Sequence, residues 1–106
     1  MITAIVRYRL PASIDREACR AHFERIAAGF GTVPGLIRKQ FIWSERGVAG
    51  GVYQWETLED AHRFYGGPWL KGILERYSAY PDIEYFTTVA VTDNPGGRVT
   101  HLMQAE

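Results

Sequence analysis

Two histidines are the side chains best suited to acid–base chemistry in this sequence of 106 residues. His62 lies with Leu58, Ala61 and Tyr65 at helical spacing, and His22 occupies a similar stripe on an earlier expected helix. An imidazole titrates near pH ~6.5, so either histidine could accept a proton from an acidic phenol or enol inside the fold. The alternative is a half-exposed histidine at the edge of its stripe, hydrogen-bonded to water or to a carbonyl.

Aromatic and polar residues also gather on two neighbouring expected strands. If these strands pair through a tight turn at residues 46–47, Arg38 faces Trp55 and Gln40 faces Tyr53. One side of the sheet then carries a cation, an amide and aromatic rings, which is the composition of a ligand-binding wall. The alternative is a cation–π pair between an arginine and a tryptophan that binds no ligand.

The pattern of apolar residues and breaks predicts the elements that must position these side chains. Strands are expected at 2–10, 36–44, 48–56 and 82–91, a helix at 14–30 after Ser13, a second helix from Thr57 to about Gly66, and a further helical turn after Pro68. The order β-α-β-β-α-β predicts a ferredoxin-like α+β fold, with a four-stranded antiparallel sheet and two helices on one face. We expect a single domain over 1–93 and a C-terminal tail over 94–106.

The first and last expected strands carry apolar residues on both of their faces. Ile2 and Val6 alternate with Ile5, and Tyr85 alternates with Phe86. Since two helices cover only one face of the sheet, we expect the other face to pack on a second copy and form a homodimer. A monomer with a mildly apolar open face is the alternative.

Composition excludes several classes of partner and cofactor. Twelve basic and twelve acidic residues give no net charge, which argues against nucleic acid or an anionic membrane as the main partner. The N-terminal sequence lacks the pattern of a signal peptide, and no apolar run is long enough to span a membrane, so we expect a cytoplasmic protein. Cys19 is the only cysteine, and neither a metal-ligand spacing nor a dinucleotide-binding glycine loop occurs. We therefore expect no metal and no bound cofactor.

The segment "PGLIRKQFIWSERGVAGGVYQWETLEDAHRFY" (34–65) resembles the YdhR-like monooxygenases of the dimeric α+β barrel, or antibiotic biosynthesis monooxygenase-like, superfamily. The matching features are Pro-Gly before the second strand, an aromatic strand ending in Ser-Glu, and Ala-Gly-Gly-x-Tyr-x-aromatic followed by an acidic helix. This resemblance implies a dimer with its sheets face to face and a cavity between the helices and the sheet of each subunit. The wider superfamily includes oxygenases that use neither metal nor flavin, as well as isomerases and proteins without an established activity.

One branch of that superfamily, the haem-degrading monooxygenases, has functional residues that can be compared with this sequence one by one. It requires an Asn on the first strand, a Trp in the second helix and a haem-ligating His ten residues later. Aligned on "WET" (55–57), this sequence has Phe64 and Leu74 at the last two positions, and its first asparagine is Asn94. The sequence therefore disfavours haem degradation.

The resemblance implies a cofactor-independent monooxygenase that acts on a small aromatic or quinol-like substrate. His62 or His22 would remove a proton, and the resulting anion would pass an electron to dioxygen. The residues expected to contact the ring are Arg38, Tyr53, Trp55, Tyr65 and Trp43, although Tyr65 and Trp43 also suit the core or a dimer contact. The alternatives are a non-catalytic dimeric protein that binds a small aromatic ligand, and an isomerase or dehydratase on the same scaffold.

Overall fold

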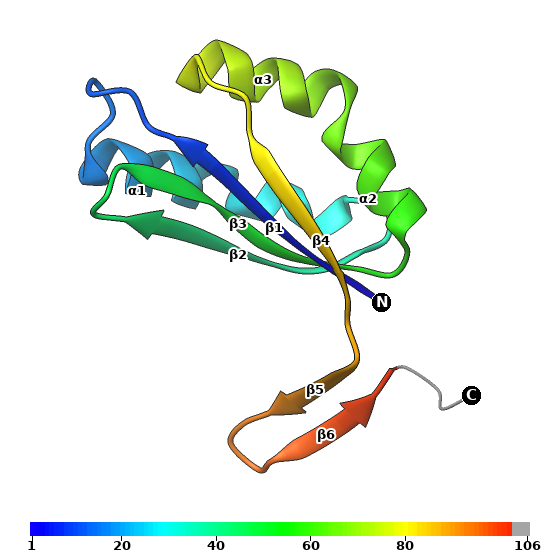
Figure 1. Cartoon of the computed structure of the whole chain (residues 1–106). Coiled ribbons are helices and arrows are strands. Elements are labelled where there is room, and N and C mark those ends of the chain that lie inside the picture. Colours follow the sequence, from blue (N-terminus) through cyan, green and yellow to red (C-terminus); the bar gives the residue numbers. More distant parts are fainter. Residues whose placement is uncertain (103–106) are drawn as a thin grey trace.

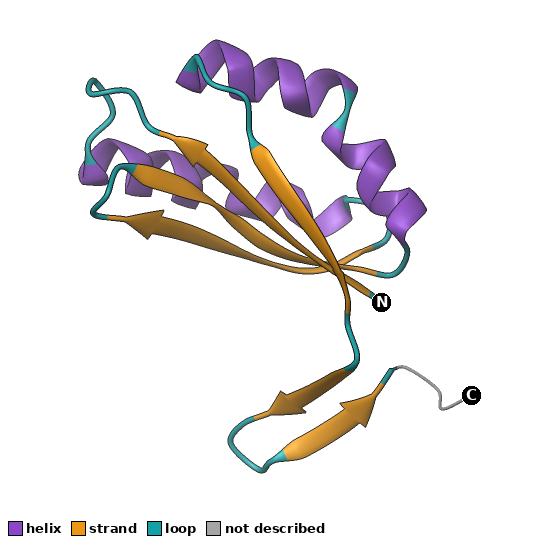
Figure 2. Cartoon of the chain, in the orientation of Figure 1, coloured by secondary structure: helices purple, strands orange, loops and turns teal. Residues whose placement is uncertain are grey.

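A four-stranded antiparallel sheet with helices on one face forms the body of the protein (Figures 1 and 2). The computed structural model describes residues 1–102. The strand order is β2-β3-β1-β4, which confirms the predicted ferredoxin-like α+β fold. The elements are β1 (Ile2–Arg9), α1 (Arg16–Ile26), the 3₁₀ helix η1 (Ala27–Thr32), β2 (Leu36–Ser44), β3 (Val48–Trp55), α2 (Leu58–Tyr65), α3 (Gly67–Tyr77), β4 (Asp82–Thr87), β5 (Ala90–Asp93) and β6 (Arg98–His101).

The first helix is shorter than predicted at both ends. Asp15, not Ser13, is its N-cap, and its carboxylate accepts a hydrogen bond from the Ala18 backbone N–H at 2.8 Å. After Ile26 the chain continues as η1, whose sequence AAGFGT contains two glycines that weaken a regular helix. The segment predicted as one helix is therefore an α-helix followed by a tighter turn of helix.

The second helical region is longer than predicted. The Thr57 hydroxyl accepts a hydrogen bond from the Asp60 backbone N–H at 3.1 Å, so α2 begins where the sequence indicates. Gly66 then interrupts the helix, and α3 runs for 11 residues with Pro68 in its first turn. The expected helical turn after Pro68 is thus a full helix, which ends at Ser78 in a left-handed conformation (φ 55°).

The β2–β3 hairpin has a different register from the one predicted. Lys39 pairs with Tyr53, and Arg38 pairs with Gln54. The cause is a three-residue loop, in which Gly47 has φ +79° and its N–H donates to the Ser44 carbonyl at 3.0 Å. A shift of one residue moves every side chain of a strand to the opposite face.

The last predicted strand, 82–91, is divided in two. β4 ends at Thr87 because β1, its neighbour, begins at Ile2; the Thr88 N–H makes the final bond, to the Met1 carbonyl at 3.0 Å. The chain then leaves the sheet, and β5 and β6 form a separate hairpin (Figure 1). Residues 94–101 of the expected tail therefore form the turn and the second strand of a β-hairpin, while residues 103–106 lie outside the described part. Across residues 1–102, no helix combines the length and apolar character needed to cross a membrane.

Candidate functional site between the helices and the sheet

A cavity of about 340 Å³ lies between the helices and the sheet. Residues of α1, η1 and α3 close it on one side, and residues of β1, β2 and β3 form its floor. It is mostly apolar, with a few polar groups that reach into it, as in small-molecule sites. Its lining consists of Tyr8, His22, Phe23, Ile26, Phe30, Lys39, Tyr53, Trp69, Gly72, Ile73, Arg76 and Tyr77.

Lys39 is the most unusual polar residue of this cavity. Its Nζ lies 3.6 Å from the ring centroid of Phe30, 3.9 Å from that of Phe41 and 4.7 Å from that of Tyr53. Burial lowers the pKa of Lys39 to about 7. Gly51 leaves room for this side chain, because a Cβ there would lie 3.0 Å from Lys39 Cε. Near neutral pH the amine is therefore present in both protonation states.

His22 and Arg76 bring two further nitrogen groups to the same cavity. Burial lowers the pKa of His22, and the positive charges of Arg76, Arg25 and Lys39 lower it further. The imidazole is thus neutral at pH 7 and can accept a proton. The Arg76 Nε is buried and has no hydrogen-bond partner among the described residues.

Two stacked tyrosines supply hydroxyl groups. The Tyr8 and Tyr77 rings lie 4.2 Å apart, and the Tyr8 hydroxyl donates to the Tyr77 oxygen at 3.5 Å. Burial raises the pKa of Tyr8 far above its ordinary value, and burial also raises the pKa of Tyr53. The Tyr8 and Tyr53 hydroxyls therefore stay protonated, and the Tyr77 hydroxyl, which accepts from Tyr8, can donate its own hydrogen bond to a ligand.

Of the two histidines predicted to point into this space, only His22 does so. His62 is exposed on α2, and its ring meets the edge of Tyr85 on β4 at 5.0 Å, outside the cavity lining. His62 therefore does not point into the cavity, and the alternative of a histidine at the edge of its stripe describes it. Its residue spacing on the helix is regular, but it lies at the edge of the buried stripe that Ala61 and Tyr65 occupy.

The predicted ligand wall is only partly realised. Tyr53 lines the cavity, whereas Trp55 and Tyr65 are buried behind it. The Trp55 ring lies parallel to that of Tyr53 at 5.9 Å, and its Nε1–H donates to the Tyr65 hydroxyl at 3.0 Å. Trp55 and Tyr65 therefore support Tyr53 from the core.

The other two predicted ligand contacts lie elsewhere. Arg38 is exposed on the sheet face opposite the helices, where it pairs with Gln54, so its expected contact with Trp55 is wrong. Trp43 points to the helix side but lies beneath the Arg16 guanidinium, whose Cζ is 5.5 Å from the ring, away from the cavity lining.

The sequence reasoning missed Lys39 and Arg76 as site residues. A signal for Lys39 exists: in the series Lys39, Phe41, Trp43, alternate residues place a lysine on the aromatic face of the strand. The register error assigned this face to Arg38 instead. Arg76 offers no comparable signal, since a basic residue in the last turn of a helix is common.

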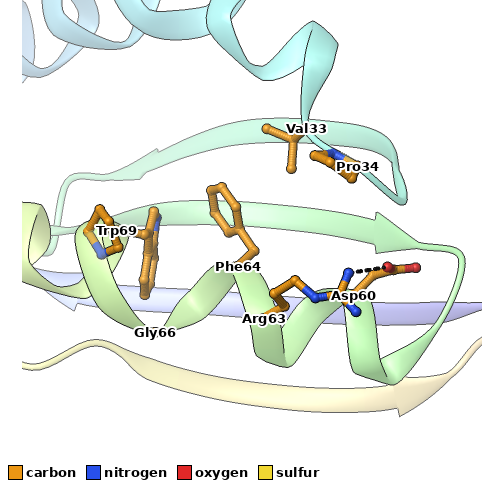
Figure 3. A pocket seen from close by; sticks show the side chains of 8 residues that line it. Val33, Pro34, Asp60, Arg63, Phe64, Gly66 and Trp69 are labelled. Carbon is orange, nitrogen blue, oxygen red and sulfur yellow. Dashed lines mark hydrogen bonds and ion pairs between the residues drawn. The ribbon is translucent and has the colours of Figure 1, made fainter.

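A second hollow, of about 330 Å³, lies between α2 and the segment before β2 (Figure 3). Phe64 points toward Val33 and Pro34 there, and Trp69 lines both this hollow and the cavity described above. Its charged groups satisfy one another, because Arg63 donates to Asp60 at 3.2 Å and to Glu59 at 3.1 Å. No carboxylate of residues 1–102 lines the first cavity, so its basic groups remain available to a ligand.

Metal-binding residues do not gather at either place. Within residues 1–102, no group of three His, Cys, Asp or Glu side chains is placed to hold a metal ion.

Solved structures with the same fold include a cofactor-independent oxygenase and a haem degrader. SnoaB from Streptomyces nogalater, solved as a point mutant, is 17% identical, with a TM-score of 0.59 over 82% of this chain and 91% of its own. MhuD from Mycobacterium tuberculosis, solved with two haems in its active site, is 20% identical, with a TM-score of 0.63 over 84% of this chain and 96% of its own. A candidate antibiotic biosynthesis monooxygenase from Caulobacter crescentus is 18% identical, with a TM-score of 0.62 over 83% of this chain and 89% of its own.

No known family profile matches the sequence, and no curated protein sequence does so either. The structural likeness confirms the subunit fold of the antibiotic biosynthesis monooxygenase-like proteins, which the sequence resemblance implied.

Proposed function

We propose that this protein is a cofactor-independent monooxygenase that binds a flat aromatic or quinol-like substrate in the cavity between the helices and the sheet. The observation that carries the proposal is the placement of a neutral imidazole and a lysine of lowered pKa among aromatic rings. The shared fold with a cofactor-independent oxygenase supports the same reaction class. No metal or flavin is required in this proposal, because the substrate anion itself supplies the electrons.

Each polar group of the cavity has a distinct role in the proposed reaction. His22 accepts a proton from the phenol or enol of the substrate. Lys39 and Arg76 stabilise the negative charge that forms on the substrate oxygen, and the Tyr77 hydroxyl, which accepts from Tyr8, donates a hydrogen bond to it. The rings of the wall hold the substrate flat and exclude water.

The redox step takes place between the substrate anion and dioxygen. The anion transfers one electron to dioxygen, and the resulting radical and superoxide combine to form a C–O bond. The peroxide takes up a proton, and loss of water from the same carbon leaves a carbonyl group. One atom of dioxygen enters the product and the other leaves as water, so a CH₂ carbon next to the aromatic system is oxidised to a ketone.

An oxygen electrode with anthrone, a flat ketone that enolises, tests this proposal. We expect enzyme-dependent oxygen uptake with formation of anthraquinone, and a fall in kcat of about 10²–10⁴-fold for His22→Gln, the range of a lost general base. His62→Gln is the matched variant and should retain the activity, because its ring lies outside the cavity.

Three results would contradict the proposal. Full activity in His22→Gln would remove that residue from the mechanism. Anthrone binding without turnover would instead support the binding protein considered above. Turnover of an enolisable substrate that proceeds without oxygen would support an isomerase or dehydratase.

We also propose that a second copy covers the open face of the sheet. That face carries Ile5, Ile42 and Val52 near its centre, and Phe86, on the edge strand, is 46% exposed. An uncovered apolar patch on a sheet favours association through it. Light scattering after gel filtration should give a dimer, and Val52→Glu should shift it to a monomer.

Leu58→Glu is the control for the dimer, because Leu58 is 41% exposed on α2, on the helix side. This variant should remain dimeric. A monomeric wild-type protein would contradict the proposed association.

A further inference from the structure

Within residues 1–102, the basic groups of the cavity have no acidic partner. Lys39, Arg76 and His22 all line it, whereas no carboxylate of residues 1–102 does. None of the ion pairs in that part of the chain involves these three residues. All three residues are half-buried, and a charge withdrawn from water is normally paired, because an unpaired one loses hydration without compensation.

We propose that the cavity recognises an aromatic anion, a carboxylate or phenolate carried on a flat ring system, whose charge lies among Lys39, His22 and Arg76. This inference rests on the proposed function for the position of the site and adds the charge of the ligand. Its anionic group supplies the partner that residues 1–102 do not provide.

The surroundings of Lys39 explain why the ligand is aromatic as well as anionic. Its Nζ lies against the faces of Phe30, Phe41 and Tyr53, so a flat ligand that reaches the amine also contacts ring surfaces. The Arg76 Nε is buried without a hydrogen-bond partner among the described residues, and a carboxylate oxygen would accept its proton. A short aliphatic acid would satisfy the charge but leave the aromatic surface uncovered.

Binding of an anion should also change the protonation of the site. The pKa of Lys39 is lowered to about 7 by burial, and an anion beside it favours the ammonium form. The pKa of His22 is lowered for similar reasons and should rise in the same way. The titratable or charged groups facing this space are Tyr8 on β1, His22 on α1, Lys39 on β2, Tyr53 on β3, and Arg76 and Tyr77 on α3. Above pH 7, we therefore expect proton uptake on binding.

The decisive comparison uses 2-naphthoate and its neutral analogue 2-naphthamide, measured without oxygen by calorimetry. We expect the wild-type protein to bind the acid at least about tenfold more tightly than the amide, the usual effect of one charge-assisted hydrogen bond. At pH 8, the binding enthalpy of the acid should differ between phosphate and Tris buffers in the sense of proton uptake. Equal affinities for acid and amide would overturn the inference without the use of any variant.

Substitutions of single basic residues show whether the preference for the acid arises in the cavity. Lys39→Met should reduce the affinity for 2-naphthoate at least about tenfold and change that for 2-naphthamide little, since only the charge is removed. Lys71→Met is the matched control, because Lys71 is an exposed lysine of α3. Arg76→Gln should also weaken binding of the acid. If Lys71→Met weakened it as much as Lys39→Met, the binding would be a surface effect and the inference would be wrong.

The outcomes also separate this inference from the proposed reaction. Oxygen-dependent turnover of anthrone, together with equal affinity for acid and amide, would preserve the reaction and overturn the anion site. Tight and selective binding of 2-naphthoate by a protein that consumes no oxygen would support the anion site and contradict the reaction.

Discussion

Replacement of Lys39 by methionine should stabilise the folded protein. Methionine is an unbranched side chain of similar length and carries no charge, so it can occupy the space among Phe30, Phe41 and Tyr53. The charge that it removes is one that the fold accommodates at a cost, because burial lowers the pKa of Lys39. The expected gain in stability is unusual, since most substitutions at buried positions destabilise a protein.

The magnitude follows from the pKa of Lys39. It falls from 10.5 to about 7 on folding, and each tenfold change in proton affinity corresponds to about 1.4 kcal/mol, so burial of the ammonium group costs about 5 kcal/mol. The substitution also removes the attraction between the ammonium and the ring faces, which is worth about 1–2 kcal/mol and reduces the gain in stability. We therefore expect Lys39→Met to raise the free energy of unfolding by about 3 kcal/mol at pH 7.

The effect has a defined dependence on pH. Between about pH 7 and 10.5, the unfolded chain keeps a proton on Lys39 that the folded protein has released. The unfolded state then binds more protons, so the stability of the wild-type protein rises with pH relative to the variant. The difference between the two proteins should be largest and constant below pH 7, and should shrink to less than about 1 kcal/mol at pH 10.

Urea unfolding followed by circular dichroism at pH 6, 8 and 10 measures this difference. Comparison with the variant at each pH cancels the titration of all other groups. Lys71→Met serves again as the control and should leave the free energy of unfolding within about 0.5 kcal/mol, as is usual for surface substitutions. A difference between wild type and Lys39→Met that does not change with pH would refute the assignment of a buried ammonium.

Three further substitutions test the packing that supports the site. Trp55→Phe should lower the free energy of unfolding by about 2 kcal/mol in urea titrations, because the Nε1–H bond to Tyr65 is lost from a fully buried position. Asp15→Ala should lower it by about 1 kcal/mol by the same measurement, since the cap of α1 is removed. Gly51→Ala should weaken 2-naphthoate binding in calorimetry, because its Cβ would lie 2.8 Å from Tyr53 Cε1 and 3.0 Å from Lys39 Cε, both in the cavity lining.

The order and type of the main elements were predictable from the sequence. Which side chains of β2 point toward the helices was not. Alternation of apolar residues defined β1, β2 and β3 to within one residue. The register of β2 against β3 depended on whether the turn contains two or three residues, and Gly47 suits both kinds of turn. A single residue in the loop therefore decided whether Arg38 or Lys39 faces the helices.

Long-range contacts explain most of what the sequence did not reveal about the site. His22 and His62 have similar helical spacing, but the position of β4 leaves His62 beside Tyr85, outside the cavity. The Arg76 side chain reaches the cavity only because α3 packs over the same face of the sheet as α1, on the other side of the cavity. Both placements depend on how helices cross the sheet, and residue spacing along a single helix carries no information about that.

The stability cost at Lys39 is itself an argument for its function. A methionine or leucine at this position would complete the aromatic layer formed with Phe41 and Tyr53 and would avoid the loss of hydration. Positions where a residue opposes the stability of its own fold are typically those that serve binding or catalysis. Gly51 leaves room for two side chains of the cavity, because a Cβ there would lie 2.8 Å from Tyr53 Cε1 and 3.0 Å from Lys39 Cε. The presence of Lys39 is therefore better explained by an anionic ligand in the cavity than by packing of the chain.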